Sequence, residues 1–444
     1  MQGQSNTSFF RITPKLKLLA ASLLTIGISA CGGGSSDKPV TSTPTPPVEA
    51  TTANIQGKIL LPDGSTPLSN ATVYIQAYSG SNPAGLHSKA NNRTCIAPTE
   101  SYLAYTCTGG DGTFSLEGLN KDSYEVFVSK GAFNTSFLVD TTNVNGDSYS
   151  ADPVALDTDL QNGSTRMAVV TGDYDAMQNV LAKSGFGNVD SFGELELGSE
   201  TFDIYVGNYD ATYSDYPDFE SLFEIDNTTG IERIHNYDIV FINCGVWEWD
   251  EQLETGNTVQ PDADHTIAVL QAYVTNGGRL YATDLAYDYI EQAFPAYIDF
   301  YADESTPDAA EALNAAEAGD ENVVVDAATL LDTNLATFLR NVNCTALESA
   351  TCINEDGTVM IEGFLPFWAI MNGAHEGSNA SFYIEAEVKS VDYEQTFIKP
   401  LTTSFNVGEG RVFFSSYHSE NHGSAGKRLY LNMHLEKYHY LKKI

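Results

Sequence analysis

Short apolar runs alternate with helical patterns along the chain from residue 166 onward. The runs at 237–243 and 280–283 hardly alternate with polar residues, as expected of strands buried on both faces of a parallel sheet. Between them, residues 265–275 carry apolar side chains at helical spacing and end at two glycines. The pattern predicts an α/β region with a central, mostly parallel sheet. Further strands are predicted at 167–172, 202–206, 381–388, 396–401 and 411–416, and further helices at 285–293 and 327–338. One more helix is predicted to follow the strand at 167–172, with Asp173 or Asp175 as its cap.

Residues 52–157 follow a different pattern, in which short alternating runs are separated by turn residues. One such turn is Pro62-Asp63-Gly64. Several short strands with turn signals between them predict an all-β sandwich. The predicted strands lie at 55–61, 71–77, 111–119 and 124–128.

Two segments interrupt these patterns. Residues 31–51 are rich in Gly, Ser, Thr and Pro, which is typical of a flexible linker. Residues 301–375 begin acidic and Ala-rich, and we interpret them as an insertion in the α/β domain, which is bounded at 166–444. The predicted fold is therefore multidomain, with the β-sandwich at 52–157 followed by the α/β domain.

The start of the chain has the features of a targeting signal. Three basic residues precede an apolar run at 18–28, which is too short to span a bilayer stably, and the run leads to Ser29-Ala30-Cys31. This segment resembles the lipobox of bacterial lipoproteins. The resemblance implies removal of a signal peptide at 1–30, acylation of Cys31 with chains such as palmitate, and anchoring in a membrane. Because Gly32 follows rather than Asp, it also implies the outer membrane, on its periplasmic face or at the cell surface.

The charge balance excludes one class of partner. The formal net charge is -37, and residues beyond 30 hold 19 basic against 59 acidic side chains. Such a field repels nucleic acid and anionic lipid, so no nucleic-acid partner is expected and membrane contact is expected through the lipid alone. The sequence gives no signal of oligomeric state.

Five cysteines remain besides the lipobox cysteine. Cys95 with Cys107, and Cys344 with Cys352, are close in sequence and lie in polar surroundings. Since an exported chain enters an oxidising compartment, two local disulfides are predicted. A zinc site is disfavoured because the spacings are not those of ligand pairs and no histidine lies beside them. Cys244, on an apolar strand, is predicted to be buried and inert.

The β region carries motifs of a known family. They are G-x-I at 57–59, D-G at 63–64, P-L-x-x-A-x-V at 67–73, and D-G-x-F-x-L-x-G-L-x-x-x-x-Y-x-V-x-V at 111–128. These motifs resemble the carboxypeptidase regulatory-like, transthyretin-like β-sandwich domain. The resemblance implies an accessory domain of a carbohydrate-binding-like fold class, without catalysis.

Three separated segments of the α/β region also carry a resemblance. They read YDIVFINCG at 237–245, NGGRLYATD at 276–284 and GEGRVFFSSYHSE at 408–420. They resemble the class I glutamine amidotransferase-like fold, which is flavodoxin-like, and within it the ThuA-like proteins. In active amidotransferases a cysteine on a tight strand-to-helix turn works with a later His-x-Glu pair. His418 and Glu420 match that pair, but Asp284 stands at the turn, so glutamine hydrolysis through a thioester is not expected.

Three interpretations of Asp284 stay open. It is a helix cap or turn residue, or it binds a sugar or a cation together with His418, Glu420 and His422, or it acts with His418 as a catalytic base or nucleophile. Trp247 and Glu248 follow the strand at 237–243 and would either stack on a sugar and accept its hydroxyls or serve as core and cap. No cofactor and no metal-ligand set is predicted, and a divalent cation stays an alternative.

The function expected from these features is that of a membrane-anchored envelope lipoprotein. It would be non-catalytic and would bind carbohydrate or act as a scaffold at the cell surface or in the periplasm. A hydrolase acting on a glycan or peptide through Asp284, His418 and Glu420 is the first alternative. A purely structural envelope protein is the second.

Overall fold

The computed structural model describes a large part of the chain between residues 51 and 418. The chain divides into two units, residues 1–48 and 49–444, and only the second contains described residues. Several predicted features lie outside the described residues: the signal peptide, Cys31, Trp247, Glu248, Cys344, Cys352, Glu420 and His422. The described residues are 51–77, 86–87, 95, 97–98, 101–130, 133–158, 165–207, 211–246, 263–301, 315–320, 324–341, 353–361, 364, 368–391 and 396–418.

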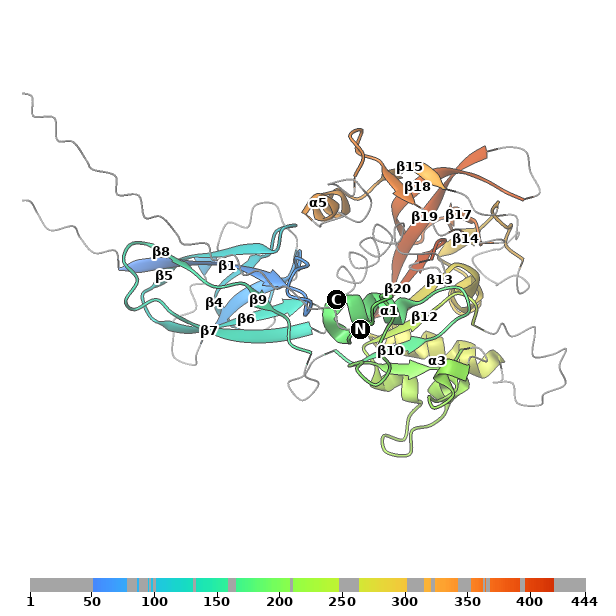
Figure 1. Ribbon diagram of the computed structural model, residues 1–444, viewed down its shortest axis with the longest axis horizontal. Helices are drawn as coiled ribbons and strands as arrows, with labels where there is room; N and C mark the ends of the chain where they lie inside the picture. Colours follow the sequence, from blue (N-terminus) through green and yellow to red (C-terminus); the bar gives the residue numbers. More distant parts are fainter. Residues whose placement is uncertain are drawn as a thin grey trace, which may run out of the picture. The chain divides into compact units, whose positions relative to one another are not determined.

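Residues 52–155 form two sheets (Figure 1). One has the order β5-β1-β8, with β9 also paired to β1, and the other has the order β3-β4-β2-β6-β7. Buried side chains of both sheets, such as Ile55 and Val126, belong to one core. The strands are β1 (Thr52–Leu60), β2 (Thr72–Gln76), β3 (Leu86–His87), β4 (Tyr102–Cys107), β5 (Thr113–Asn120), β6 (Ser123–Lys130), β7 (Phe133–Asp140), β8 (Ser148–Ser150) and β9 (Val154–Ala155).

The predicted strands correspond to β1, β2, β5 and β6, whereas β4 and β7 were not predicted. The turn at Asp63 forms because its carboxylate accepts hydrogen bonds from the backbone N–H groups of Ser65 and Thr66, at 2.8 and 2.7 Å. A Cβ at Gly112, where φ is +76°, would lie 2.5 Å from the carbonyl oxygen of Ile59. The D-G turn before β5 therefore requires glycine.

The predicted disulfide between Cys95 and Cys107 is confirmed, with 5.6 Å between the two Cα atoms. It ties the end of β4 to a residue 12 positions earlier.

Replacing both Cys95 and Cys107 by alanine is expected to lower the free energy of unfolding by about 2–3 kcal/mol, because the unfolded chain regains the entropy of an open loop. Urea unfolding of the variant and of the wild-type chain measures the difference. Reductant alone is no substitute, since it would also act on any bond between Cys344 and Cys352. An unchanged midpoint in the double variant would contradict the prediction.

The second region contains a nine-stranded sheet with the order β11-β10-β12-β13-β20-β19-β18-β15-β16. Neighbouring strands are parallel in the half of the sheet formed by β11, β10, β12, β13 and β20. Neighbouring strands are antiparallel in the other half, from β20 through β19, β18 and β15 to β16. The strands of this sheet are β10 (Met167–Val170), β11 (Asp203–Tyr205), β12 (Ile239–Ile242), β13 (Arg279–Thr283), β15 (Val325–Leu330), β16 (Val359–Ile361), β18 (Ser381–Lys389), β19 (Thr396–Val407) and β20 (Gly410–Ser415), and a separate pair is formed by β14 (Ile298–Phe300) and β17 (Met371–Ala374).

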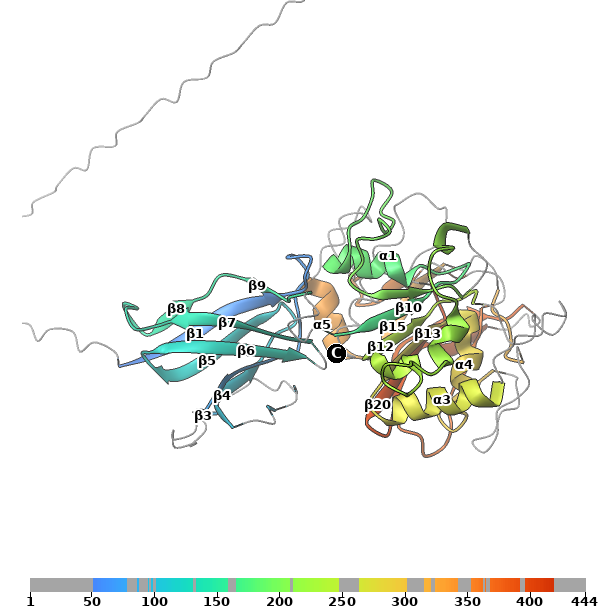
Figure 2. The same ribbon diagram turned by 90° about the horizontal axis from the view of Figure 1, so that it is seen from below.

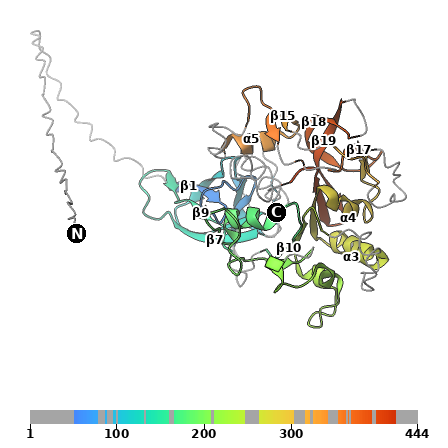
Figure 3. The same cartoon turned by 45° about the vertical axis from the view of Figure 1, so that its right-hand side comes forward.

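The expectation of a mostly parallel sheet is therefore wrong, because the sheet is mixed. A two-residue turn makes β19 and β20 a hairpin, which reverses the direction. Residues 325–330 and 359–361, within the predicted insertion, extend the same sheet as β15 and β16 (Figure 3).

Helices cover both faces of the parallel strands (Figure 2). The core around α1 contains Phe241 and Tyr281, and the core around α3 contains Val240 and Leu280. Successive strand residues thus point to opposite buried faces, which explains why the runs do not alternate. The helices are α1 (Met177–Leu181), α3 (Ala263–Thr275), α4 (Asp288–Glu291) and α5 (Thr333–Asn341), with a π-helical turn η2 (Ala182–Phe186) and the 3₁₀ turns η3 (Ala211–Tyr213), η4 (Phe219–Phe223), η5 (Arg233–Asn236) and η6 (Asp284–Tyr287).

Two helix predictions are corrected. The helix predicted at 327–338 is β15 followed by α5, which starts where the Asp332 carboxylate accepts the Leu335 N–H at 2.8 Å. Helix α1 is preceded by Ala176 without a side-chain cap, so neither Asp173 nor Asp175 caps it. Among the described residues, no helix has both the length and the apolar character needed to cross a bilayer.

Candidate functional site

The carboxyl ends of β12, β13 and β20 lie at one edge of the sheet, because these strands are parallel neighbours. Cys244 follows β12, Asp284 follows β13, and His418 follows β20. Ligands in open α/β sheets collect at such an edge. The fold therefore brings together two residues that the sequence analysis paired, Asp284 and His418, and a third that it set aside.

Asp284 occupies a sharp strand-to-helix turn. Its φ is +47°, and Asn70 is the only other non-glycine residue with positive φ in the described part of the chain. The left-handed conformation costs an L-residue about 1–2 kcal/mol, although aspartate tolerates it better than most. Thr283 holds the cap position of η6, and no side-chain cap bond forms there. Asp284 is therefore a turn residue, as one part of the first interpretation expects, but it is not the helix cap.

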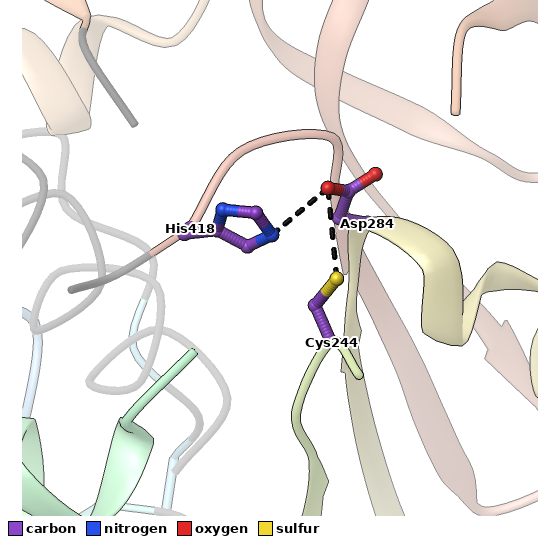
Figure 4. Close-up of side chains that lie close together, drawn as sticks. All are labelled: Cys244, Asp284 and His418. Carbon is purple, nitrogen blue, oxygen red and sulfur yellow. Dashed lines mark hydrogen bonds and ion pairs between the residues drawn. The ribbon is translucent and has the colours of Figure 1, made fainter. Parts of the chain in front are cut away.

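The Asp284 carboxylate instead contacts three groups from distant parts of the chain, and Figure 4 shows two of them, His418 and Cys244. Its Oδ1 accepts the backbone N–H of Ala369 at 2.9 Å. Its Oδ2 lies 2.8 Å from His418 Nε2, which is an ion pair when the imidazole is protonated, and 3.6 Å from Cys244 Sγ. All three side chains are 1% exposed or less. The donor atoms of Cys244, Asp284 and His418 all lie within 4.8 Å of one another.

A chain of buried hydrogen bonds joins the loops that follow β10, β12 and β13. The Cys244 backbone N–H donates to Thr283 Oγ1 at 3.0 Å, and that hydroxyl donates to Asp175 Oδ2 at 2.8 Å. Asn243, next to Cys244, donates to Gln178 Oε1 at 3.0 Å. The loops after β10, β12 and β13 are therefore held together behind the Asp284 carboxylate.

Two glycines let Cys244 reach its place. A Cβ at Gly172 would lie 2.0 Å from the Cys244 carbonyl oxygen, and Gly245 has a φ of +84°. Both positions exclude larger side chains, because one allows a close backbone approach and the other a left-handed turn. Cys244 was not predicted as part of the site, although residues that follow adjacent parallel strands meet at one edge and the sequence places Cys244 directly after such a strand.

Burial raises the pKa of the Cys244 thiol well above its ordinary value, and the negative charge of Asp284 raises it further. The backbone N–H of Leu285 acts in the opposite direction but does not offset these effects. The thiol is therefore protonated at neutral pH and donates to Asp284. Cys244 is free, as predicted, and buried.

We expect the Cys244 thiol to be inert toward Ellman's reagent in the folded, metal-free protein and to react once urea unfolds the chain. The measurement uses a chain in which Cys31, Cys344 and Cys352 are serine, so that Cys244 is the one reactive cysteine besides the bonded pair. Rapid reaction under native conditions would contradict the burial of this side chain.

The other predicted site residues cannot be placed beside this cluster, because Trp247, Glu248, Glu420 and His422 lie outside the described residues. Sequence reasoning missed Ala369, whose backbone N–H orients the carboxylate. A backbone donor from a distant loop leaves no signature in the side-chain pattern.

Comparisons with known proteins leave the family open. No protein-family model matches the sequence, and no curated protein matches it significantly. Among solved structures, a cytoplasmic protein of Salmonella typhimurium is similar over 63% of this chain and 98% of its own, with 11% identity and a TM-score of 0.30. A ThuA-like protein of Parabacteroides merdae is similar over 63% and 90%, with 11% identity and a TM-score of 0.32.

The major pilin subunit of Bacillus cereus is similar over 24% of this chain, with 11% identity and a TM-score of 0.16. The chain spans only 30% of the length of that pilin. Likenesses at these TM-scores carry no argument about fold or function.

Proposed function

We propose that this chain is a membrane-anchored envelope lipoprotein whose α/β region is amidotransferase-like and hydrolyses a glycan or peptide at Asp284 and His418. The observation that carries the hydrolytic function is the 2.8 Å contact between the Asp284 carboxylate and His418 Nε2 at the carboxyl edge of parallel strands. The lipobox at Cys31 supports the anchoring, and the motifs at 237–245, 276–284 and 408–420 support the amidotransferase-like fold.

The pair has the groups that hydrolysis needs. A carboxylate and an imidazole in contact can activate a water molecule in two ways. They can accept its proton, or they can hold a cation that lowers the pKa of the water. The water oxygen then bonds to the glycosidic or carbonyl carbon, the bond from that carbon to the leaving oxygen or nitrogen breaks, and the proton taken from the water passes to the leaving atom. Asp284 supports this role because its strained turn and its bond to Ala369 hold the carboxylate in one orientation.

The test uses purified peptidoglycan, casein and a panel of nitrophenyl glycosides as substrates. If the wild-type chain releases product from one of them, Asp284→Asn and His418→Ala should each lower the rate by about 100-fold or more. Asp203→Asn is the matched control, because Asp203 accepts a hydrogen bond from Tyr237 at the opposite edge of the sheet. No hydrolysis of any substrate by the wild type, or full activity in Asp284→Asn, would count against the proposal.

A second function is favoured by the burial of the same residues, since a site at 0–1% exposure is better suited to structure than to turnover. This is scaffolding, or non-catalytic binding of carbohydrate away from the buried cluster, with the β region as the accessory domain. Calorimetric titration with soluble glycans separates the two functions, because binding without product release supports the second one. If neither binding nor hydrolysis is found, the purely structural interpretation is favoured.

Anchoring has its own test. Wild-type protein expressed in a bacterium should incorporate labelled palmitate, and Cys31→Ala should abolish the label and leave the precursor uncleaved. Label that persists in this variant would contradict the assignment of the lipobox.

A further inference from the structure

We propose that Cys244, Asp284 and His418 form a binding site for a divalent zinc-type cation. The cation alternative drawn from the sequence combined Asp284 and His418 with Glu420 and His422 and did not include Cys244. The inference rests on the proposed function only for the role of the metal, because cation binding itself requires no hydrolysis.

The donor atoms lie close to the spacing that a tetrahedral ion requires, since all three are within 4.8 Å of one another. With the usual bond lengths to zinc, a ring nitrogen and a carboxylate oxygen sit about 3.4 Å apart, and a sulfur and a carboxylate oxygen about 3.6 Å apart. The corresponding distances here are 2.8 Å from His418 Nε2 to Asp284 Oδ2 and 3.6 Å from Cys244 Sγ to the same oxygen. The distance from His418 Nε2 to Asp284 Oδ2 has to increase by about 0.6 Å, which small changes in the side-chain torsion angles can provide. A cation can then bind between the three side chains (Figure 4).

The chemistry of the donors selects the class of metal. A thiolate is a soft ligand, and imidazole suits zinc, cobalt, nickel and copper, whereas magnesium and calcium prefer sets made of oxygen atoms. Metal binding releases the proton of the Cys244 thiol, and the resulting thiolate and the Asp284 carboxylate together carry two negative charges, which a divalent cation neutralises. Three protein ligands leave a fourth position for water or substrate, as in catalytic rather than structural zinc sites.

Groups around the ligands support the same assignment. The Ala369 N–H holds Asp284 Oδ1, so Oδ2 is directed toward the imidazole and the thiol. Outer hydrogen bonds of this kind orient ligands in metal sites and contribute to affinity. The near-complete burial of all three side chains strengthens the attraction between a cation and its ligands.

Cobalt(II) is the sharpest probe, because a cysteine thiolate bound to it gives a charge-transfer band in the near ultraviolet. The experiment uses the full chain in detergent, treated with chelator, in a background where Cys344 and Cys352 are serine. We expect one cobalt per chain with that band, displacement by zinc, and no effect of magnesium. Cys244→Ser should lose the band, and Asp284→Asn and His418→Ala should each weaken zinc binding by about 10-fold or more.

Matched controls are Asp203→Asn and His265→Ala, which alter a carboxylate bonded to Tyr237 and an imidazole that contacts the Phe223 carbonyl. Both should leave zinc affinity unchanged. Absence of the band in the wild-type background overturns the proposal whether or not any variant folds, and a band that persists in Cys244→Ser overturns it as well.

The outcomes also separate this site from the proposed function. A cobalt band without hydrolysis of any substrate leaves the metal site standing and contradicts the hydrolase. If hydrolysis persists after the chelator is added and no cobalt band is seen, the hydrolase is supported and the metal site is contradicted.

Discussion

The Asp284→Ala variant is expected to unfold with a free energy about 3–5 kcal/mol below that of the wild type, because removing one partner strands the others in a buried site. The substitution leaves the Ala369 N–H without its acceptor and removes the charge that faces His418 and Cys244. Urea unfolding followed by circular dichroism gives the difference.

A double-mutant cycle with His418→Ala tests the pairing itself. If the two side chains stabilise each other, the double variant should be less destabilised than the sum of the single variants. Asp203→Ala is the matched control, since it removes a carboxylate that accepts one hydrogen bond at 2.6 Å, and it should cost only about 1 kcal/mol. Equal losses for Asp284→Ala and Asp203→Ala would show that the buried cluster contributes nothing beyond an ordinary hydrogen bond.

Replacing Trp368 by alanine is the second change with a large expected effect, a loss of about 3–5 kcal/mol in the free energy of unfolding. Trp368 is fully buried, and its ring lies 4.7 Å from that of Phe364. Its indole N–H donates to the Asp320 carbonyl at 3.0 Å. A Cβ at Gly319 would lie 1.8 Å from the indole ring, so the backbone already passes directly against it.

The variant should also loosen the site, because Trp368 directly precedes the residue whose N–H holds Asp284. We expect the Cys244 thiol to react faster with Ellman's reagent in Trp368→Ala than in the wild type. Trp368→Phe is the control, since it keeps a large ring and loses only the indole bond, and it should cost less than half as much. Wild-type stability in Trp368→Ala would contradict the packing of this loop.

Much of the parallel half of the sheet could be predicted from the sequence. The strands β10, β12, β13 and β20 are buried on both faces, which requires unbroken apolar runs, and such runs are visible without a structure. The antiparallel half of the sheet was harder to predict from the sequence. The helix predicted at 327–338 begins too early, because residues 325–330 pair with β18 and β16, and this tertiary pairing outweighs the local propensity.

The site was predictable in part. Asp284 and His418 were paired by a family resemblance, and the structure places them in contact. Cys244 was set aside because it ends a different strand, although adjacent parallel strands end side by side. The contact with Ala369 had no signal at all, since it depends on a loop 85 residues away that offers only its backbone.

The pairing of β13 with β20 has a consequence for the order of folding. Tyr281 and Ser415, in contact across these two strands, are separated by 134 residues, so this pairing has a high contact order and forms slowly. Until β20 docks, His418 is missing from the cluster and Cys244 is not yet enclosed. The Cys95–Cys107 bond closes over only 12 residues, so its loop-closure cost is lower than that of a bond from either cysteine to Cys244. The short spacing of Cys95 and Cys107 therefore favours their own pairing over a pairing of either one with Cys244 while that thiol is not yet enclosed.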